Sequence, residues 1–365
     1  MPERQTSDNT VRACLLFISA VLVVYSFHVL RDILAPLAMA IFIWLIIDAF
    51  ARWIDEMASW IPYWLGLTLA LITVVLGLVG VALIITDTGF NIARDAPRYS
   101  ARIQEITGWI ADVSGREISY EELDREFAVT RRLQSGLLGL AGSVQSVLSD
   151  FLVIGVYVAF LFAAQSSFAG KMDDLFPDSE GRRRASHVTG RIRESVEKYL
   201  GVQTVASLIQ TVLSYIVMVG FGLENALFWA MVIFILNYIP IIGGIFAVVL
   251  PVLFALVQFD SLRVFAVFTI ALTLVQAVFN NFVQPRMMGD SMNMSALVVI
   301  LSLTLWGALW GGVGMFLSAP LTVITMIILA QFPATRWISV LLSVDGYPDD
   351  EKNPDNDKKN IMPPS

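Results

Sequence analysis

The sequence contains 365 residues, of which 56% are hydrophobic and only 15% are charged, whereas charged residues make up about 25% of an average soluble domain. The apolar residues gather in nearly uncharged stretches of about 20, the length at which a helix crosses the hydrocarbon core of a lipid bilayer. These features exclude a soluble protein and predict an all-α, polytopic integral membrane protein. The net charge of −7 leaves no basic surplus for phosphates, which excludes nucleic acid as a partner.

The first region, residues 1–85, contains three stretches that we predict to be transmembrane helices: Val11 to Leu30, Ile33 to Ile54 and Ile61 to Ile85. Residues 86–146 have the composition of a soluble segment and are predicted to form a helical extramembrane insert. Its first helix has apolar residues at steps of three and four, at Tyr99, Ile103, Ile106, Ile110 and Val113. Ser119 and Glu122 form a capping box that predicts a second short helix.

Residues 147–198 are predicted to hold a fourth span, Val147 to Ala164, and then a basic loop. Residues 199–335 are almost continuously apolar and form a second membrane region, beginning with a fifth span from Tyr199 to Phe221. The tail, residues 336–365, is polar. If the N-terminus is cytoplasmic, 15 of the 24 Lys and Arg residues lie on the inner side, so we predict that both termini are cytoplasmic.

The second membrane region is interrupted first at residues 237–244. The apolar stretch before this break, Glu224 to Ile235, would rise only about 18 Å as a helix and is too short to span. Pro240 removes a backbone donor, and Gly243 and Gly244 permit non-helical backbone. Irregular backbone at membrane depth must be buried in protein or line a cavity. We therefore predict a re-entrant hairpin, with a spanning helix kinked at the proline as the alternative.

A second break follows the predicted sixth span, Leu262 to Phe282. The half-length stretch Ser295 to Leu305 leads into it, and a return arm runs from Met315 to Ala330. Gly243 and Pro251 are eight residues apart, and so are Gly312 and Pro320. This spacing suggests two helix-plus-hairpin repeats. They would be inverted relative to each other, as in many secondary transporters. The chain would then have about six full spans plus two hairpins, or eight spans if both breaks are kinks.

Three segments of this region resemble the autoinducer-2 exporter family of bacterial membrane proteins. Residues 237–243, NYIPIIG, resemble the family signature N-[FY]-I-P-x-[IV]-G, and residues 281–289 resemble its N-x-x-x-P-x-[IM]-[ML]-G segment. Matches to the C-terminal pattern lie at 297–302, Trp306-Gly307, Trp310-Gly311, Gly314-Met315 and 319–322. The resemblance implies a multi-pass protein of the bacterial inner membrane that exports small polar solutes such as autoinducer-2, with sodium/proton exchange in some members. Together with the amphipathic insert, it implies a homo-oligomer.

Polar residues inside the apolar spans are candidates for a solute or ion pathway, because each costs free energy in lipid unless it is paired or solvated. Asn237 lies where the carbonyl end of one half-helix meets the amide end of the next. Carboxamides recur near helical spacing on the sixth span and can bind a polyhydroxylated solute or supply oxygens to Na⁺. Hydrogen bonds between helices are their alternative role. The candidate pathway residues are Asn237, Pro240, Gly243, Gly244, Gln276, Asn280, Asn281, Gln284, Pro285, Trp306, Gly307, Gly311, Gly312, Gly314 and Pro320.

Two carboxylates are candidates for proton coupling. Asp48 lies deep in the second apolar stretch, with Arg52 one helical turn away, and an ion pair between them is the alternative role. Glu224 opens a half-helix, where its charge also complements the helix dipole.

The sequence lacks the H-E-x-x-H, G-x-S-x-G and Walker motifs, so we predict no enzyme, no resident cofactor and no ATP hydrolysis. The working hypothesis is a secondary transporter that exports a small polar solute by alternating access, with its site between the two breaks. A Na⁺(Li⁺)/H⁺ antiporter is the first alternative, and a pore-forming channel is the second.

Overall fold

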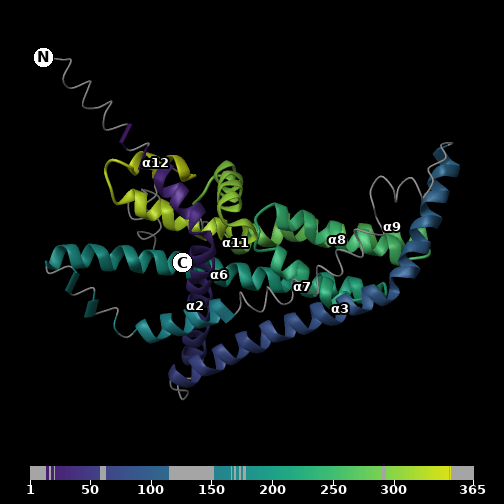
Figure 1. Cartoon of the computed structure of the whole chain (residues 1–365), viewed down its shortest axis with the longest axis horizontal. Helices are drawn as coiled ribbons and strands as arrows, with labels where there is room; N and C mark the ends of the chain where they lie inside the picture. The colour runs from purple at the N-terminus through teal and green to yellow at the C-terminus, as the bar shows by residue number, and fades with distance from the viewer. Residues whose placement is uncertain are drawn as a thin grey trace, which may run out of the picture. The chain divides into compact units, whose positions relative to one another are not determined.

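The computed structural model describes residues 14–15, 18–19, 21–57, 63–114, 152–165, 167, 170–171, 174–175, 178–288, 293–344 and 346. This part of the chain is helical, with one isolated β-bridge between Met294 and Ser343 and no strand, which confirms the all-α prediction (Figure 1). The predicted capping box at 119–122 lies outside the described residues. The helices are α2 (Arg31–Met57), α3 (Tyr63–Ser114), α6 (Ser179–Gly220), α7 (Ala226–Leu236), α8 (Ile242–Gln258), α9 (Leu262–Val278), the π-helix η1 (Phe279–Val283), α10 (Gln284–Met288), α11 (Ala296–Ala330) and α12 (Arg336–Leu342).

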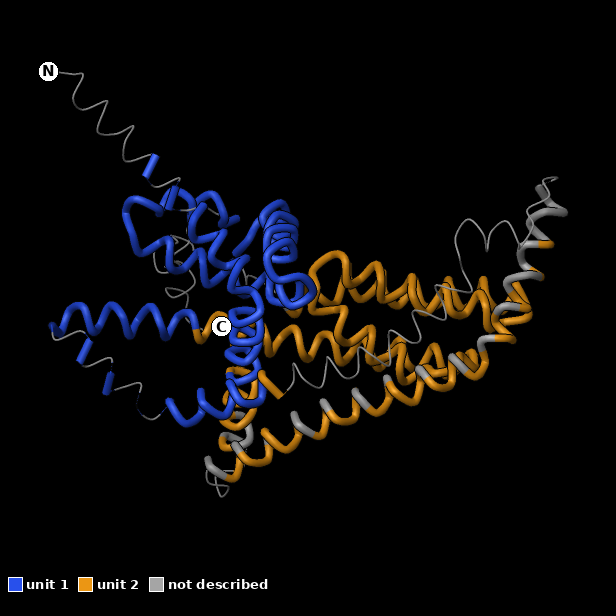
Figure 2. Tube along the Cα trace, in the orientation of Figure 1, with its two compact units in different colours: residues 1–44, 154–192, 293–365 blue, residues 45–153, 193–292 orange. Residues whose placement is uncertain are grey.

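The chain forms two compact units (Figure 2). Unit 1 comprises residues 1–44, 154–192 and 293–365, and unit 2 comprises residues 45–153 and 193–292. The first predicted break therefore belongs to unit 2 and the second to unit 1.

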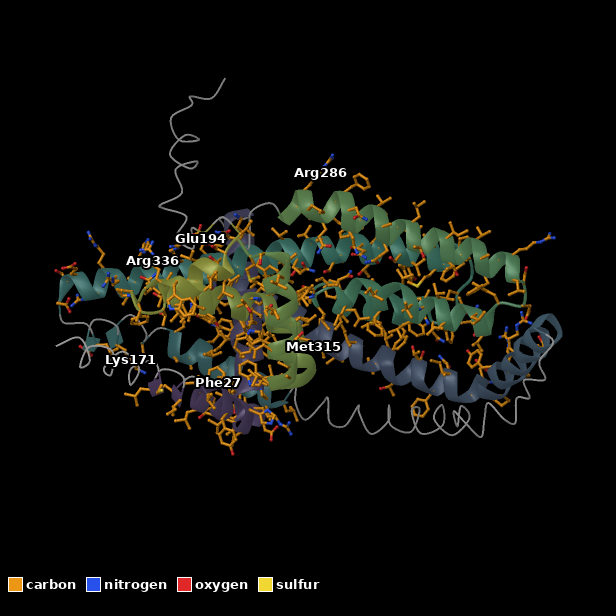
Figure 3. The ribbon with its side chains drawn as sticks, turned by 90° about the horizontal axis from the view of Figure 1, so that it is seen from above. Phe27, Lys171, Glu194, Arg286, Met315 and Arg336 are labelled. Carbon is orange, nitrogen blue, oxygen red and sulfur yellow. The ribbon has the colours of Figure 1, made fainter. Side chains whose placement is uncertain are left out.

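Four helices in the described part of the chain are long and apolar enough to cross a membrane: Arg31–Arg52, Ser179–Gly220, Leu262–Met287 and Ala296–Ala330. Shorter apolar helices include Leu152–Gln165, α7 and α8. Large apolar side chains such as Ile216, Leu253 and Ile270 are exposed along these helices, and Figure 3 shows carbon-rich side chains along the ribbons of α8 and α9. Such a surface is compatible with lipid tails, in agreement with a polytopic membrane protein.

Helix α3 joins the third predicted span to the predicted insert without interruption. Its 52 residues correspond to about 78 Å of helix, and it contains the amphipathic stretch predicted around Tyr99. The proposed boundary between residues 85 and 86 therefore falls inside one helix.

The second half of the predicted basic loop, residues 165–198, is helical, because α6 begins at Ser179 and continues into the fifth span. The Asp178 carboxylate accepts the backbone N–H of Gly181 at 2.7 Å, as a residue that caps a helix N-terminus does. Further along, Arg193 Nε donates to Glu197 at 2.8 Å across one helical turn. Local capping and this ion pair stabilise a helix in a segment whose hydrophilic composition suggests a loop.

In unit 2, α7 and α8 pack against each other, α9 packs on α8, and α3 contacts both α7 and α8 (Figure 1). The core between these helices and the end of α6 is apolar, with Met218, Ile233, Phe268 and Leu272 almost completely buried. In unit 1, α12 packs on α11, and the buried Ser339 hydroxyl donates to the carbonyl of Met326 at 2.9 Å.

Candidate functional site

The first break is a tight turn between α7 and α8. Ile241 has φ 63° and ψ −60°, and the N–H of Ile242 donates to the carbonyl of Pro240 at 2.6 Å. This is a γ-turn with positive φ, a rare and strained conformation, especially for a β-branched residue.

Gly243 permits the chain to reverse after this turn. A Cβ atom on Gly243 would lie 1.8 Å from the carbonyl oxygen of Leu236, the last residue of α7. Because α7 has 11 residues, or about 16 Å of helix, and packs against α8, the break is a helical hairpin and not a kinked spanning helix.

Helix α6 presents a polar face to the interior of unit 2. Gln203, Ser207, Gln210 and Ser214 are spaced by four, three and four residues and are all buried. Sequence reasoning missed them, although their helical spacing within the fifth span was visible. Isolated polar residues in an apolar stretch do not indicate which helix they face.

Gln203 links α6 to the first break. Its Nε2 donates to the backbone carbonyl of Asn237 at 2.7 Å and to Ser207 Oγ at 3.2 Å. Thr204 and Tyr238 form a second link, with their hydroxyl oxygens 2.7 Å apart. These bonds satisfy polar groups at the C-terminal end of α7 that would otherwise be costly in a membrane.

Polar residues from α9, η1 and α10 face α6 within unit 2. Gln210 Nε2 donates to Gln276 Oε1, and Gln276 Nε2 donates to Asn280 Oδ1 at 3.2 Å. Asn280 lies within η1, whose wider turn rotates less per residue than an α-helix. The π-helix therefore keeps Gln276, Asn280 and Gln284 near one face.

A cavity of about 60 Å³ lies among these elements, enough for several water-sized groups. None of the eleven lining residues in this described part of unit 2 carries a charge. The side-chain nitrogen Nδ2 of Asn237 is buried and has no hydrogen-bond partner among the described residues. The lining residues are Gln203, Ser207, Gln210, Asn237, Ile239, Pro240, Ile241, Gly244, Phe279, Asn280 and Gln284.

The structure brings together most of the residues predicted at the first break. Five of the predicted pathway residues line the cavity, namely Asn237, Pro240, Gly244, Asn280 and Gln284, while Gln276 is bonded to two lining residues and Gly243 makes the turn. Two others lie elsewhere. Asn281 is exposed and donates to the carbonyl of Ala277 at 2.8 Å. Pro285 is exposed in α10, next to Arg286, whose side chain points away from the helices in Figure 3.

The second break, in unit 1, has different surroundings. Gly311 has φ 61° and ψ −136°, which interrupts α11. A Cβ atom on Gly314 would lie 1.8 Å from the carbonyl oxygen of Trp306, although eight residues of straight helix would rise about 12 Å. The chain therefore reverses here too. The glycine in close approach is Gly314, two residues after Gly312, which the spacing comparison aligned with Gly243.

Aromatic rings fill this second turn. The rings of Trp306 and Trp310 are 5.2 Å apart, and Phe27 lies 6.0 Å from Trp310. Both indole nitrogens have partners, because Trp306 donates to Thr322 Oγ1 and Trp310 donates to the carbonyl of Phe27, each at 3.1 Å. Of the other predicted residues, Gly307 lies beside Met315, and Pro320 is buried in the part of α11 that follows the turn.

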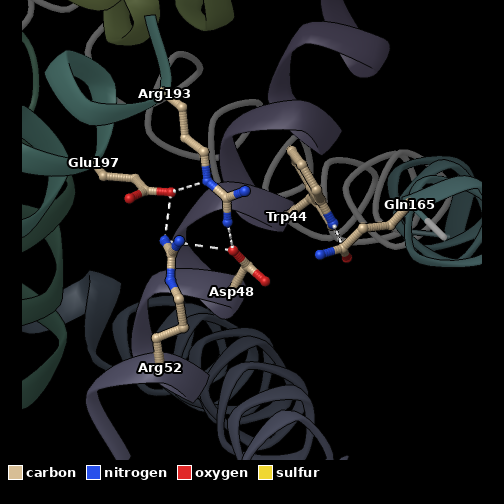
Figure 4. A network of polar contacts seen from close by, with 6 residues as sticks. All are labelled: Trp44, Asp48, Arg52, Gln165, Arg193 and Glu197. Carbon is tan, nitrogen blue, oxygen red and sulfur yellow. Dashed lines mark hydrogen bonds and ion pairs between the residues drawn. The ribbon is translucent and has the colours of Figure 1, made fainter. Parts of the chain in front are cut away.

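Asp48 lies in a network of four charged residues within unit 2 (Figure 4). Its side chain is 1% exposed and pairs with Arg193 and, at 3.4 Å, with Arg52. Glu197 completes the network through bonds of 2.6 Å to Arg52 and 2.8 Å to Arg193. Two guanidinium groups balance two carboxylates, so this burial is electrostatically compensated. Asp48 is not among the residues that line the cavity.

Glu224 is held at the other end of α7 by the insert part of α3. It accepts Arg98 Nη1 at 2.8 Å and the Tyr99 hydroxyl at 3.0 Å. Burial and the bond to Glu224 raise the pKa of Tyr99, so this hydroxyl remains a donor. These contacts anchor the hairpin to α3.

Comparison with known proteins supports a membrane transport role. A family model described as AI-2E family transporter matches residues 16–334. The chain is 27% identical to "AI-2 transport protein TqsA" of Escherichia coli K12, over 92% of this chain and 96% of that protein. A "Putative transport protein" of Haemophilus influenzae is 27% identical over 93% and 98%. "Putative transport protein YhhT" of Escherichia coli K12 is 26% identical over 94% and 97%.

Proposed function

Because this chain belongs to the AI-2E family of transporters, we propose that it exports a small, uncharged polar solute that binds in the cavity at the first break. The observation that carries the proposal is the composition of that cavity. Five carboxamides and one hydroxyl surround it, and no lining residue is charged. Such groups donate and accept hydrogen bonds, as recognition of hydroxyl and carbonyl groups requires.

A solute of the autoinducer-2 type is the member of this class that the comparisons favour. The name of the Escherichia coli relative states that it transports AI-2. Alternating access would expose the cavity to each side in turn. The strained turn at Ile241 and the short helices α7 and α8 make this hairpin the element that we propose to move.

Monovalent cation exchange is supported less well by this geometry. Carboxamide oxygens can bind Na⁺, but a proton carrier would need a titratable group, and the cavity lining has none. Asp48 pairs with two arginines, and Glu224 is held by Arg98 and Tyr99. Both contacts fit structural roles.

Counterflow in proteoliposomes tests the proposal. Vesicles preloaded with an unlabelled candidate solute should accumulate the labelled solute, across a panel that ranges from autoinducer-2 to simple polyols. Asn237→Ala and Asn280→Ala should lower counterflow at least about tenfold, because each removes a hydrogen bond to a buried solute. Asn281→Ala is the matched control and should transport like wild type.

Three outcomes would contradict this proposal. If Asn237→Ala and Asn280→Ala transport like wild type, the site is elsewhere. Proton flux driven by an imposed Na⁺ gradient, without solute counterflow, would favour the antiporter. Unitary currents without counterflow would indicate a channel.

We also propose that both termini face the cytoplasm of a bacterial inner membrane, because this orientation places the basic first half of α6 inside. A cytoplasmic reporter fused after residue 365 should be active, and a periplasmic reporter should be silent. The reverse result would invert the topology.

A further inference from the structure

Three amide side chains form a series of hydrogen bonds beside the cavity, in which the first residue, Gln210, and the last, Asn280, both line the cavity. Gln210 is 2% exposed and Gln276 is 8% exposed, whereas Asn280 is exposed. Gln210 donates to Gln276, and Gln276 donates to Asn280.

In such a series of hydrogen bonds, donation runs in one direction. A carboxamide accepts through its oxygen and donates through its nitrogen, so the direction of one bond determines the direction of the next. Since the oxygen of Asn280 accepts from Gln276, Nδ2 is the group that Asn280 has left to offer to a solute.

Gly244 leaves room for this nitrogen. A Cβ atom at position 244 would lie 2.9 Å from Asn280 Nδ2 and 3.0 Å from Gln276 Nε2. On the other side of the hairpin turn, Asn237 Nδ2 is buried without a partner in the described structure. Asn237 and Asn280, each with a side-chain nitrogen that donates no hydrogen bond among the described residues, line the same cavity.

We propose that Asn237 and Asn280 present N–H donors to hydrogen-bond acceptors of the solute, carbonyl or hydroxyl oxygens, and that Gln276 is a positioning residue that keeps Asn280 in its donor orientation. This inference rests on the proposed function and narrows its substrate class. A donor-only group, such as an ammonium, finds no acceptor at these two positions and is disfavoured there.

Three solutes with the same carbon skeleton test the inference. Dihydroxyacetone carries an acceptor-only carbonyl on its central carbon, glycerol a hydroxyl, and serinol an ammonium near neutral pH. Ligand-observed NMR titration of the purified full-length chain in detergent measures their relative affinities. We expect dihydroxyacetone to bind about tenfold more tightly than serinol, with glycerol between them, because an unmatched donor loses one hydrogen bond.

Two variants separate positioning from general structural support. In Asn280→Asp, one carboxylate oxygen still accepts from Gln276 and the other faces the cavity, so the preference should invert in favour of serinol. In Gln276→Leu, Asn280 can turn either edge to the solute, and the ratio of affinities should fall to within about twofold. A purely structural role for Gln276 would weaken all three solutes equally and leave the ratio unchanged. Asn281→Leu is the control and should keep the wild-type ratio.

The outcomes distinguish the two proposals. If serinol binds as tightly as dihydroxyacetone to the wild type, the donor assignment is wrong while the cavity remains the site. If Asn280→Asp kept the wild-type preference for dihydroxyacetone over serinol, the donor assignment would also be wrong. If none of the three solutes binds and the counterflow panel is silent, the proposed function fails and this inference fails with it.

Discussion

Both helix breaks reverse the chain at a glycine, but they have different surroundings. At each, a glycine approaches a backbone carbonyl of the preceding half-helix so closely that a Cβ atom would lie 1.8 Å from its oxygen, at Gly243 and at Gly314. The first turn lies against carboxamides and a cavity. The second lies among Phe27, Trp306 and Trp310.

This difference indicates that the formation of a hairpin and its function depend on different residues. Glycine and tight backbone packing are sufficient to reverse the chain inside an apolar region. The side chains that pack around the turn from other segments determine whether it lies beside polar groups or among aromatic rings. We therefore propose solute binding at the first break and a structural role for the second.

The largest effects should come from Gly243→Ala and Gly314→Ala. Each Cβ atom would meet a backbone carbonyl, which cannot move aside as a flexible side chain can, so we expect each variant to lose more than about 3 kcal/mol of unfolding free energy. Thermal unfolding in detergent and the yield of folded protein measure this loss. Gly312→Ala, with open space around its Cβ position, is the matched control. Destabilisation of only one of the two variants would show that the two breaks do not both require a glycine at the point of close approach.

A smaller effect is expected where polar bonds support each turn. Gln203→Leu removes the donor to the carbonyl of Asn237, and we expect a loss of about 1–3 kcal/mol together with loss of counterflow, because Gln203 also lines the cavity. Trp306→Phe removes the bond to Thr322 together with part of a buried ring, and should cost about 1–3 kcal/mol with transport retained. Loss of transport in a folded Trp306→Phe protein would contradict the division of roles between the breaks.

The first break shows how much of the site can be read from the sequence. Asn237, Pro240 and Gly243 stand out because proline, glycine and asparagine interrupt an apolar stretch of insufficient length. The spans and the all-α class follow from the same local signals. These are properties of a few neighbouring residues, and the sequence contains them directly.

What the sequence does not reveal depends on contacts between distant segments. Gln203 bonds to a carbonyl 34 residues later, and Gln210 bonds to a side chain 66 residues later. The π-helix that keeps Asn280 and Gln284 on one face has no sequence signal that we recognised. The same glycine-rich pattern at the second break predicted a pathway there as well, because a break does not specify the side chains that pack around it.

The next largest effect, on counterflow, is expected for Gly244→Ala in comparison with Gly307→Ala. Both new methyl groups would meet the ends of flexible side chains, at 2.9 Å from Asn280 Nδ2 and 2.8 Å from Met315 Cγ. Both variants should therefore fold with losses of about 1 kcal/mol, the lower end of the cost of an added methyl group in a packed site. Gly244→Ala displaces a group that faces the cavity, so counterflow should fall about tenfold, whereas Gly307→Ala should transport normally. Equal counterflow in the two variants would remove Gly244 from the site.

The smallest effect concerns the strained residue of each turn. Ile241 has positive φ, so Ile241→Gly should relieve strain and raise the unfolding free energy by about 1 kcal/mol. Gly311 also has positive φ, and Gly311→Ala should lower the unfolding free energy by about the same amount. If the strain at Ile241 contributes to the proposed movement of the hairpin, its relief should slow that movement. A more stable Ile241→Gly protein with slower counterflow is therefore expected, and unchanged transport would show that the strain does not contribute to the motion.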